Sequence, residues 1–265
     1  MTSPFSNQLV AEVSLEHAPL VKVLVQMRFP TIAKIDSIDA IAALQDQLKQ
    51  SYSILRQEHQ VPLVPVGAGA TPVQVFGTIW RLSSTDSKWV VVLARDFVAM
   101  ETSAYVSRTD FVGRWTEVLE AMSAADLTPA VYDRLGIRYI DRLDEEEMVN
   151  DLAQLVRPEM LGITNVEVPN GSSMEVNVTQ AQFRIDGLEM KASWGILPAR
   201  TVILPGIDAV DTRSWILDVD VYQEQQESYD IASVVELTTA ASVRAYEFFR
   251  WSVTDEFLRR HGGEA

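Results

Sequence analysis

The chain has 265 residues, of which 47% are hydrophobic, and a formal net charge of −15 at pH 7. A chain of this composition can bury enough apolar surface to offset its conformational entropy, which excludes a disordered protein. No apolar run approaches the ~18 residues that a membrane helix needs, and no basic start precedes an apolar block, so we expect neither a membrane span nor a secretory signal.

Cysteine is absent, which excludes disulfides, thiolate zinc sites and cysteine nucleophiles and fits a reducing, cytoplasmic compartment. The charge is uneven, because residues 1–143 carry 13 Lys/Arg and 15 Asp/Glu, whereas residues 144–265 carry 9 and 22. Such an acidic surface either keeps the protein dissolved or attracts a basic protein partner to the C-terminal half. It repels nucleic-acid backbones, and no Lys/Arg-rich run offers a footprint, so we expect no nucleic-acid partner.

The first elements in the chain are a strand and a helix. Residues 19–29 alternate between apolar and polar positions, which predicts a half-buried strand that Pro30 ends. Apolar residues at three- and four-residue spacing predict an amphipathic helix over 36–59. Residues 61–72 read as a Pro/Gly loop.

Two strands and a second helix follow. Residues 73–82 and 89–105 are predicted strands, and the second is apolar on both faces at its start, which is typical of a central strand. Ser107 and Asp110 resemble a capping box, so we expect a helix to begin there. Its apolar stripe consists of Phe111, Trp115, Val118, Leu119 and Met122. A strand over 132–143 completes a β-α-β-β-α-β order, the split unit of ferredoxin-like folds.

In the second half, Asp144 is predicted to cap a helix over 145–156, whose three glutamates suit the positive end of a helix dipole. Residues 174–197 read as a hairpin, because Asp186-Gly187 supplies the residues that a tight turn requires. Residues 214–225 alternate as another strand. Asp230 and Thr254 are predicted to cap helices over 231–251 and 255–260.

The predicted fold class is α+β, with antiparallel sheet covered by helices on one face. We expect a ferredoxin-like half at 1–143 and an acidic α-β-β-(β)-β-α half at 144–265. Both halves contain a Trp-led strand followed by a long capped helix, which indicates a weak internal duplication. No long linker separates the halves, so a single continuous domain is the alternative to two.

Motifs for enzymatic chemistry are missing from the sequence. The three histidines, His17, His59 and His261, have no metal-ligand neighbour at helical spacing, and we expect them on the surface. The glycines of 67–72 are followed by no lysine and do not form a phosphate loop. We therefore expect no cofactor, no metal and no catalytic residue, and the sequence favours a protein without enzymatic activity.

Charged residues within strands or at their ends give the first set of candidate site residues. Each must reach solvent or find a partner on another element, because burying a lone charge is costly. A network of structural ion pairs would satisfy them, and a ligand site for phosphate esters or nucleotides would use the arginines. The ligand-binding candidates are Arg28, Asp96, Glu101, Arg138, Asp141 and Arg142. For Asp141 we expect hydrogen bonds from the backbone or from an arginine on a neighbouring strand.

The predicted strand 214–225 gives a second set. Asp218 and Asp220 share one face, and Glu224 continues the row, so these three are candidates for binding a basic partner. Carboxylates at this spacing could also hold Mg²⁺, although any solvent-facing strand has the same pattern. Phe76 and Trp80 share a strand face that could stack RNA bases, but the basic surround that RNA binding needs is missing.

Four segments together resemble a sporadically distributed prokaryotic protein family of similar length. They are "PLVKVLVQMRFP" (19–30), "GIRYIDRL" (136–143), "LDVDVYQ" (217–223) and "FFRWSVTDEFLRR" (248–260). The resemblance implies a cytosolic protein without an established activity. It also implies a patchy distribution, similar to that of mobile defence or toxin–antitoxin genes.

Two hypotheses of function remain open. The first is a non-enzymatic interaction module whose acidic C-terminal half binds a basic protein partner, such as a toxin or another component of a defence system. The second is a small-ligand binding protein or hydrolase that uses the strand-end Arg and Asp/Glu residues on a phosphate or nucleotide. Self-association as a homo-oligomer is a further expectation, through strand edges or the aromatic segment 247–251.

Overall fold

The computed structural model of the protein describes residues 3–5, 11–59, 77–166, 169, 172, 174–203 and 206–263. The chain folds into two compact units that are both discontinuous in sequence. Unit 1 contains residues 1–23, 136–223 and 239–265, and unit 2 contains residues 24–135 and 224–238. The predicted loop at 61–72 lies outside the described residues.

Unit 2 begins within the first strand of the chain and contains the following elements in order: β1 (Leu20–Arg28), the 3-10 helix η1 (Ala33–Asp36), α1 (Ile38–Leu48), β2 (Ile54–His59), β3 (Thr78–Ser83), β4 (Trp89–Ala94), β5 (Phe97–Thr102), α2 (Arg108–Ala124), β6 (Val131–Tyr132) and β11 (Glu227–Ser228). Strands β2, β3, β4 and β5 pair with one another as successive antiparallel neighbours. The short strands β6 and β11 form a separate antiparallel pair.

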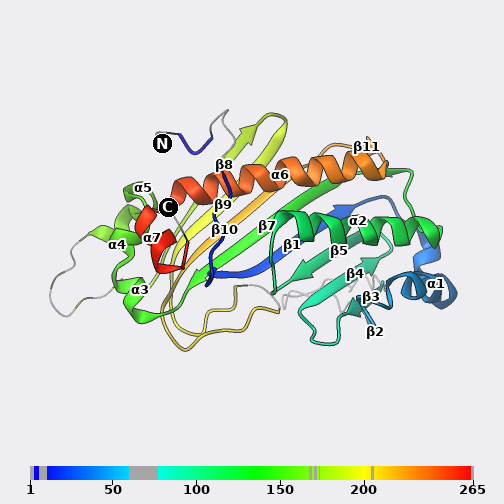
Figure 1. The fold of residues 1–265 in the computed structure, drawn as a ribbon, viewed down its shortest axis with the longest axis horizontal. Coiled ribbons are helices and arrows are strands. Elements are labelled where there is room, and N and C mark those ends of the chain that lie inside the picture. Colours follow the sequence, from blue (N-terminus) through cyan, green and yellow to red (C-terminus); the bar gives the residue numbers. More distant parts are fainter. Residues whose placement is uncertain are drawn as a thin grey trace, which may run out of the picture. The chain divides into compact units, whose positions relative to one another are not determined.

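Unit 1 contains most of β7 (Arg134–Leu143) and the elements α3 (Glu146–Asn150), α4 (Leu152–Leu155), α5 (Pro158–Leu161), η2 (Gly162–Asn165), β8 (Asn177–Ile185), β9 (Leu188–Leu197), β10 (Ser214–Gln223) and α7 (Asp255–Arg260). Helix α6 (Ile231–Ser252) begins in unit 2 and ends in unit 1. The large antiparallel sheet has the strand order β2-β3-β4-β5-β1-β7-β10-β9-β8 (Figure 1). The α+β class is therefore confirmed by the described residues.

The predicted helix over 36–59 is wrong in its second part. Helix α1 ends at Leu48, and residues from Ile54 onward form β2, paired with β3 from Ile54↔Ser83 to His59↔Thr78. Tyr52, between the two elements, is fully buried and its hydroxyl contacts the Met100 sulfur at 3.4 Å. The apolar spacing fits a helix as well as a strand here, and the ladder with β3 decides for the strand.

The predicted strand over 89–105 is also two elements. Strands β4 and β5 are joined by Arg95-Asp96, with Ala94 opposite Phe97. This short turn places both charges at the surface of unit 2, where Asp96 is exposed and Arg95 approaches the Asp36 carboxylate at 3.7 Å. A charged pair inside an apolar run therefore marks a hairpin, because the turn brings it to solvent.

Helix α2 follows the prediction closely. The Ser107 hydroxyl accepts a hydrogen bond from the Asp110 N–H at 3.1 Å, as a capping residue should. The predicted stripe is buried, and Phe111 packs its ring 5.9 Å from that of Trp89 on β4. Trp80, predicted on an open strand face, is instead buried and donates to the Ile35 carbonyl at 2.8 Å.

In unit 1 the β8–β9 hairpin is confirmed. Ile185 lies opposite Leu188, so the turn has the two residues Asp186 and Gly187. Their φ angles, +50° and +83°, are both positive, as a type I′ turn requires. Gly187 supplies the left-handed conformation without steric cost.

Asp144 does not cap a helix. Residues 146–155 form two short helices, α3 and α4, and the residue before α3 is Glu145, whose side chain makes no capping bond. The Asp144 carboxylate instead accepts from Arg142 Nε at 3.2 Å, and this ion pair competes with the capping role. The caps at Asp230 and Thr254 are confirmed, since their side chains accept from the N–H groups of Ser233 and Phe257.

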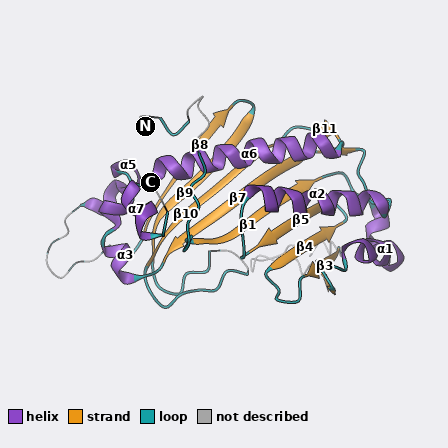
Figure 2. Ribbon diagram, in the orientation of Figure 1, coloured by secondary structure: helices purple, strands orange, loops and turns teal. Residues whose placement is uncertain are grey.

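The core of unit 1 lies between α6 and one face of its strands. In the part of α6 that belongs to unit 1, Ala241, Ala245 and Phe248 of the predicted stripe are buried. In the part that belongs to unit 2, Val234 and Thr238 are buried and Ile231 is half-buried. Phe248 packs against the rings of Trp194 and Phe183, which belong to β9 and β8. The inward residues of β10 are buried as predicted: Trp215, Leu217, Val219 and Val221. The second half of α6 thus covers the face of β8, β9 and β10 to which these side chains point (Figure 2).

Two side chains expected at the surface are buried. His261 packs its ring on Phe257 at 4.2 Å, and its Nδ1 lies 2.7 Å from the Phe257 carbonyl oxygen. Lys22 lies on the predicted polar face of β1, yet Gly206 approaches it so closely that a side chain at 206 would meet the Lys22 ammonium at 3.0 Å. No helix in the described part of the chain is long and apolar enough to cross a membrane.

Candidate functional site: a charged pocket on the open sheet face of unit 1

The pocket is built by strand alternation. On β10, Leu217 and Val219 are buried, so Asp218 and Asp220 point to the opposite face of the sheet. The register with β9 places Ser193 opposite Asp218 and Lys191 opposite Asp220. The hairpin register then places Gln180 of β8 opposite Ser193.

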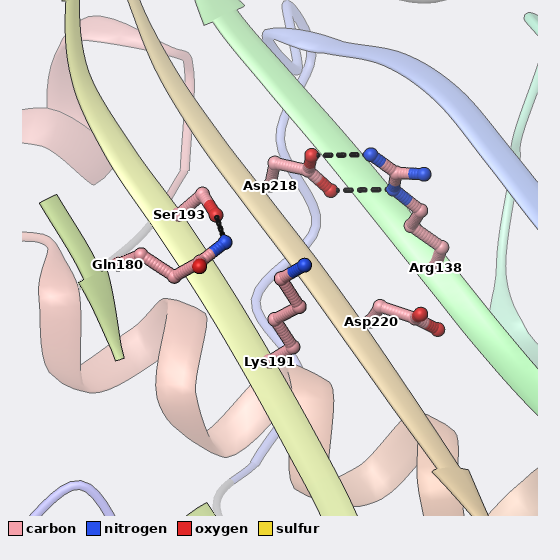
Figure 3. A pocket seen from close by; sticks show the side chains of 6 residues that line it. All are labelled: Arg138, Gln180, Lys191, Ser193, Asp218 and Asp220. Carbon is pink, nitrogen blue, oxygen red and sulfur yellow. Dashed lines mark hydrogen bonds and ion pairs between the residues drawn. The ribbon is translucent and has the colours of Figure 1, made fainter. Parts of the chain in front are cut away.

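An arginine from β7 completes the pocket (Figure 3). Arg138 donates from Nε to Asp218 Oδ1 at 2.7 Å and from Nη2 to Oδ2 at 2.6 Å, a bidentate fork between strands. The side chains of Arg138 and Asp218 are only 28% and 13% exposed. The hydrogen bonds that Arg138 donates to Asp218 raise the pKa of Arg138, against the opposing effect of burial, so the guanidinium stays charged.

The remaining lining groups are polar as well. Gln180 Nε2 donates to the Ser193 hydroxyl at 3.1 Å. The Lys191 side chain extends from β9 towards β10, the strand that carries Asp218 and Asp220 (Figure 3). The pocket has a volume of about 180 Å³ and is lined by Arg138, Gln180, Lys191, Ser193, Asp218 and Asp220. Its formal charges are two positive and two negative, so it can contact both a cation and an anion.

Asp141 lies near the pocket but does not line it. Tyr139, two residues earlier on β7, points toward α6 and shares a 2.7 Å hydrogen bond with Ser242, and alternation places Asp141 on that same side. Asp141 is 6% exposed, and burial, together with the nearby Asp218 carboxylate, raises its pKa to about 7. The adjacent arginines have other partners, because Arg138 binds Asp218 and Arg142 binds Asp144 and the Asp208 carbonyl.

The structure brings one ligand candidate, Arg138, together with two partner candidates, Asp218 and Asp220. The other candidates lie elsewhere. Arg28 ends β1 in unit 2 and is exposed, and Glu101 on β5 approaches Arg81 at 3.6 Å. Asp96 is exposed in the β4–β5 turn, and its carbonyl accepts from the Phe29 N–H. Glu224 is exposed after β10 and belongs to unit 2.

Three pocket residues were missed by the sequence analysis: Gln180, Lys191 and Ser193. The Asp186-Gly187 turn fixes the hairpin register, so the pair Gln180↔Ser193 could have been predicted. The pairing of β9 with β10 could not, because residues 198–213 separate the two strands. Among the described residues, no three His, Asp or Glu side chains gather as a metal ion would need.

Comparisons with known proteins identify no relative that could assign a role to this pocket. No model of a known protein family matches the chain, and a search of curated proteins finds no significant match.

Proposed function

We propose that this protein acts by binding, without catalysis, and that the pocket of unit 1 holds a basic side chain of a protein partner. The observation that carries this proposal is the fork between Arg138 and Asp218, at 2.7 and 2.6 Å. The pocket already accommodates one guanidinium against a carboxylate. Asp220, two residues along the same strand face, lines the pocket with a second carboxylate.

The net charge of the chain also supports binding of a basic partner. The chain carries −15, so a basic partner is attracted before contact. The acidity is divided between the units, however, because residues 224–238 belong to unit 2. Unit 1 has 12 Lys/Arg against 21 Asp/Glu, a balance of −9, and unit 2 has 10 against 16, a balance of −6. The pocket therefore supplies the specificity, and the whole chain supplies the attraction.

The test uses a short Lys/Arg-rich peptide and a matched peptide in which Glu replaces the basic residues, with binding followed by fluorescence anisotropy. We expect the basic peptide to bind and Asp220→Asn to weaken it roughly tenfold, because the variant loses a charged hydrogen-bond acceptor. The control is Asp211→Asn, which changes the net charge equally at an exposed carboxylate paired with Arg200. If both variants weaken peptide binding equally, the pocket is not the binding site. If the basic peptide does not bind at all, the proposal is wrong.

The alternative is a pocket for a phosphate ester or nucleotide, with or without hydrolysis. Lys191 favours it, because this exposed residue lines the same pocket as Arg138 and adds a second positive charge. The two carboxylates oppose it, since they would repel a phosphate. Titration with ATP and with inorganic phosphate distinguishes the two functions. A rise in melting temperature that Lys191→Met abolishes would favour the alternative.

Finer expectations accompany this proposal. A ferredoxin-like arrangement of residues 1–143, a cytoplasmic location and a role in a defence or toxin–antitoxin system all stay predictions. The first follows from the order of sequence patterns, the second from the lack of cysteine, and the third from the family resemblance.

A further inference from the structure

Strand β8 is the last strand in the described order, and its outer edge has no neighbour there. Because Ile185 and Leu188 flank a two-residue turn, the odd-numbered residues of β8 exchange hydrogen bonds with β9. The backbone N–H and C=O groups of the even-numbered residues therefore point outward. These are Val178, Gln180, Gln182 and Arg184, and their side chains are also exposed.

This edge lacks the devices that usually prevent strands from pairing between molecules. Over nine residues, "NVTQAQFRI", it contains no proline, glycine, lysine or carboxylate. Val178 is 50% exposed and Val176, just before the strand, is 58% exposed. The single charge, Arg184, is offset within the chain by Glu189 at 3.2 Å. A long, nearly neutral edge on a chain of charge −15 is a template for strand addition.

The side chains of the edge are complementary to themselves. If two copies meet antiparallel with Ala181 on a twofold axis, Gln180 lies opposite Gln182 of the second copy, and Val178 lies opposite Arg184 of the second copy. The amides can then pair, the aliphatic stem of Arg184 covers the exposed valine, and the two guanidiniums lie at opposite ends. The smallest side chain, Ala181, faces its own copy on the axis. The twofold axis repeats each of these two residue pairs, so four pairs form, and each exchanges two backbone hydrogen bonds, about eight in all.

We propose that β8 is the interface of a homodimer, in which a second copy of this chain adds its own β8 antiparallel about Ala181. The interface continues the sheet of unit 1 and leaves the hairpin bonds to β9 intact. A strand pair alone buries less area than most stable interfaces, so the dimer is expected at concentrations on the order of 100 μM and dissociates on dilution.

A single engineered cysteine tests the register, because the chain has none of its own. Ala181→Cys places two thiols face to face at a pair without hydrogen bonds, where Cα atoms lie about 4.5 Å apart and a disulfide fits. The control, Thr179→Cys, points to the same face, but its two copies would lie about 14 Å apart. Under mild oxidation we expect a covalent dimer from Ala181→Cys and little from Thr179→Cys. Equal yields would overturn the proposed axis.

Sedimentation of the unmodified chain and of two edge variants tests the interface itself. Gln182→Pro removes only an outward N–H, so it should abolish the dimer while β9 pairing survives, whereas Gln182→Ala keeps that N–H and should stay dimeric. Circular dichroism verifies that both variants fold. If Gln182→Pro fails to fold, the cysteine pair still decides. A wild-type chain that is monomeric at the highest concentration would overturn the proposal, and a strand accepted from another protein would then be the remaining use of this edge.

Discussion

Asp141 is a buried carboxylate whose ionisation state changes near neutral pH. Its pKa is raised from 3.8 to about 7, chiefly because burial removes water and secondly because the Asp218 carboxylate is near. The folded state therefore binds this proton more tightly than the unfolded state does. The stability that this difference provides is complete below about pH 4 and is lost as pH rises through about 7. The loss amounts to ~4 kcal/mol.

Asp141→Asn should remove this pH dependence, because the amide is neutral at every pH and has nearly the same shape. We expect the variant to be more stable than the parent chain at about pH 8 and to differ little from it at about pH 4. Urea unfolding at the two pH values measures the effect. The control is Asp211→Asn, because the Asp211 side chain is exposed. This substitution should change stability by the same amount at both pH values. Equal stabilisation by Asp141→Asn at both pH values would show that the carboxylate is not the cause.

Two glycines of different elements give a matched test of local structure. Gly187 has φ +83° in the β8–β9 turn, and Gly113 is an exposed residue within α2. Neither would meet another atom within 4 Å if it gained a Cβ, so only backbone conformation differs. We expect Gly187→Ala to destabilise the fold by ~1 kcal/mol and Gly113→Ala to stabilise it by up to ~1 kcal/mol. Thermal unfolding of both variants measures the change in stability. A change in the same direction for both variants would contradict the type I′ turn.

The elements that the sequence predicted well have strong local signals. The Ser107 cap and the Asp186-Gly187 turn act within a few residues, so their effect can be read without tertiary contacts. The elements that were predicted wrongly have local patterns that fit both a helix and a strand. Residues 54–59 continue a helical spacing, yet they form a strand because they pair with β3, which begins after residue 77. The pocket depends on still longer contacts, since Arg138 and Asp218 are 80 residues apart. Alternation identified them as outward charges, but only the strand order could make them neighbours.

At the scale of the whole molecule, net charge acts oppositely on the two proposed associations. Each chain carries −15, so a second copy is repelled at long range and the β8 interface must overcome this repulsion. A basic partner is attracted by the same charge. Salt screens both effects, because the Debye length falls from about 14 Å at 50 mM to about 4 Å at 500 mM.

Raising NaCl from about 50 to about 500 mM should therefore strengthen the homodimer and weaken binding of the basic peptide. Sedimentation equilibrium measures the first association and fluorescence anisotropy the second, on the same preparation. The Glu-substituted peptide is the control for non-specific salt effects, and Gln182→Pro is the control for self-association through β8. A dimer that dissociates in salt would mean that ion pairs hold it, which the nearly neutral β8 edge cannot supply. Peptide binding that resists salt would place the contact on apolar surface, away from Asp218 and Asp220.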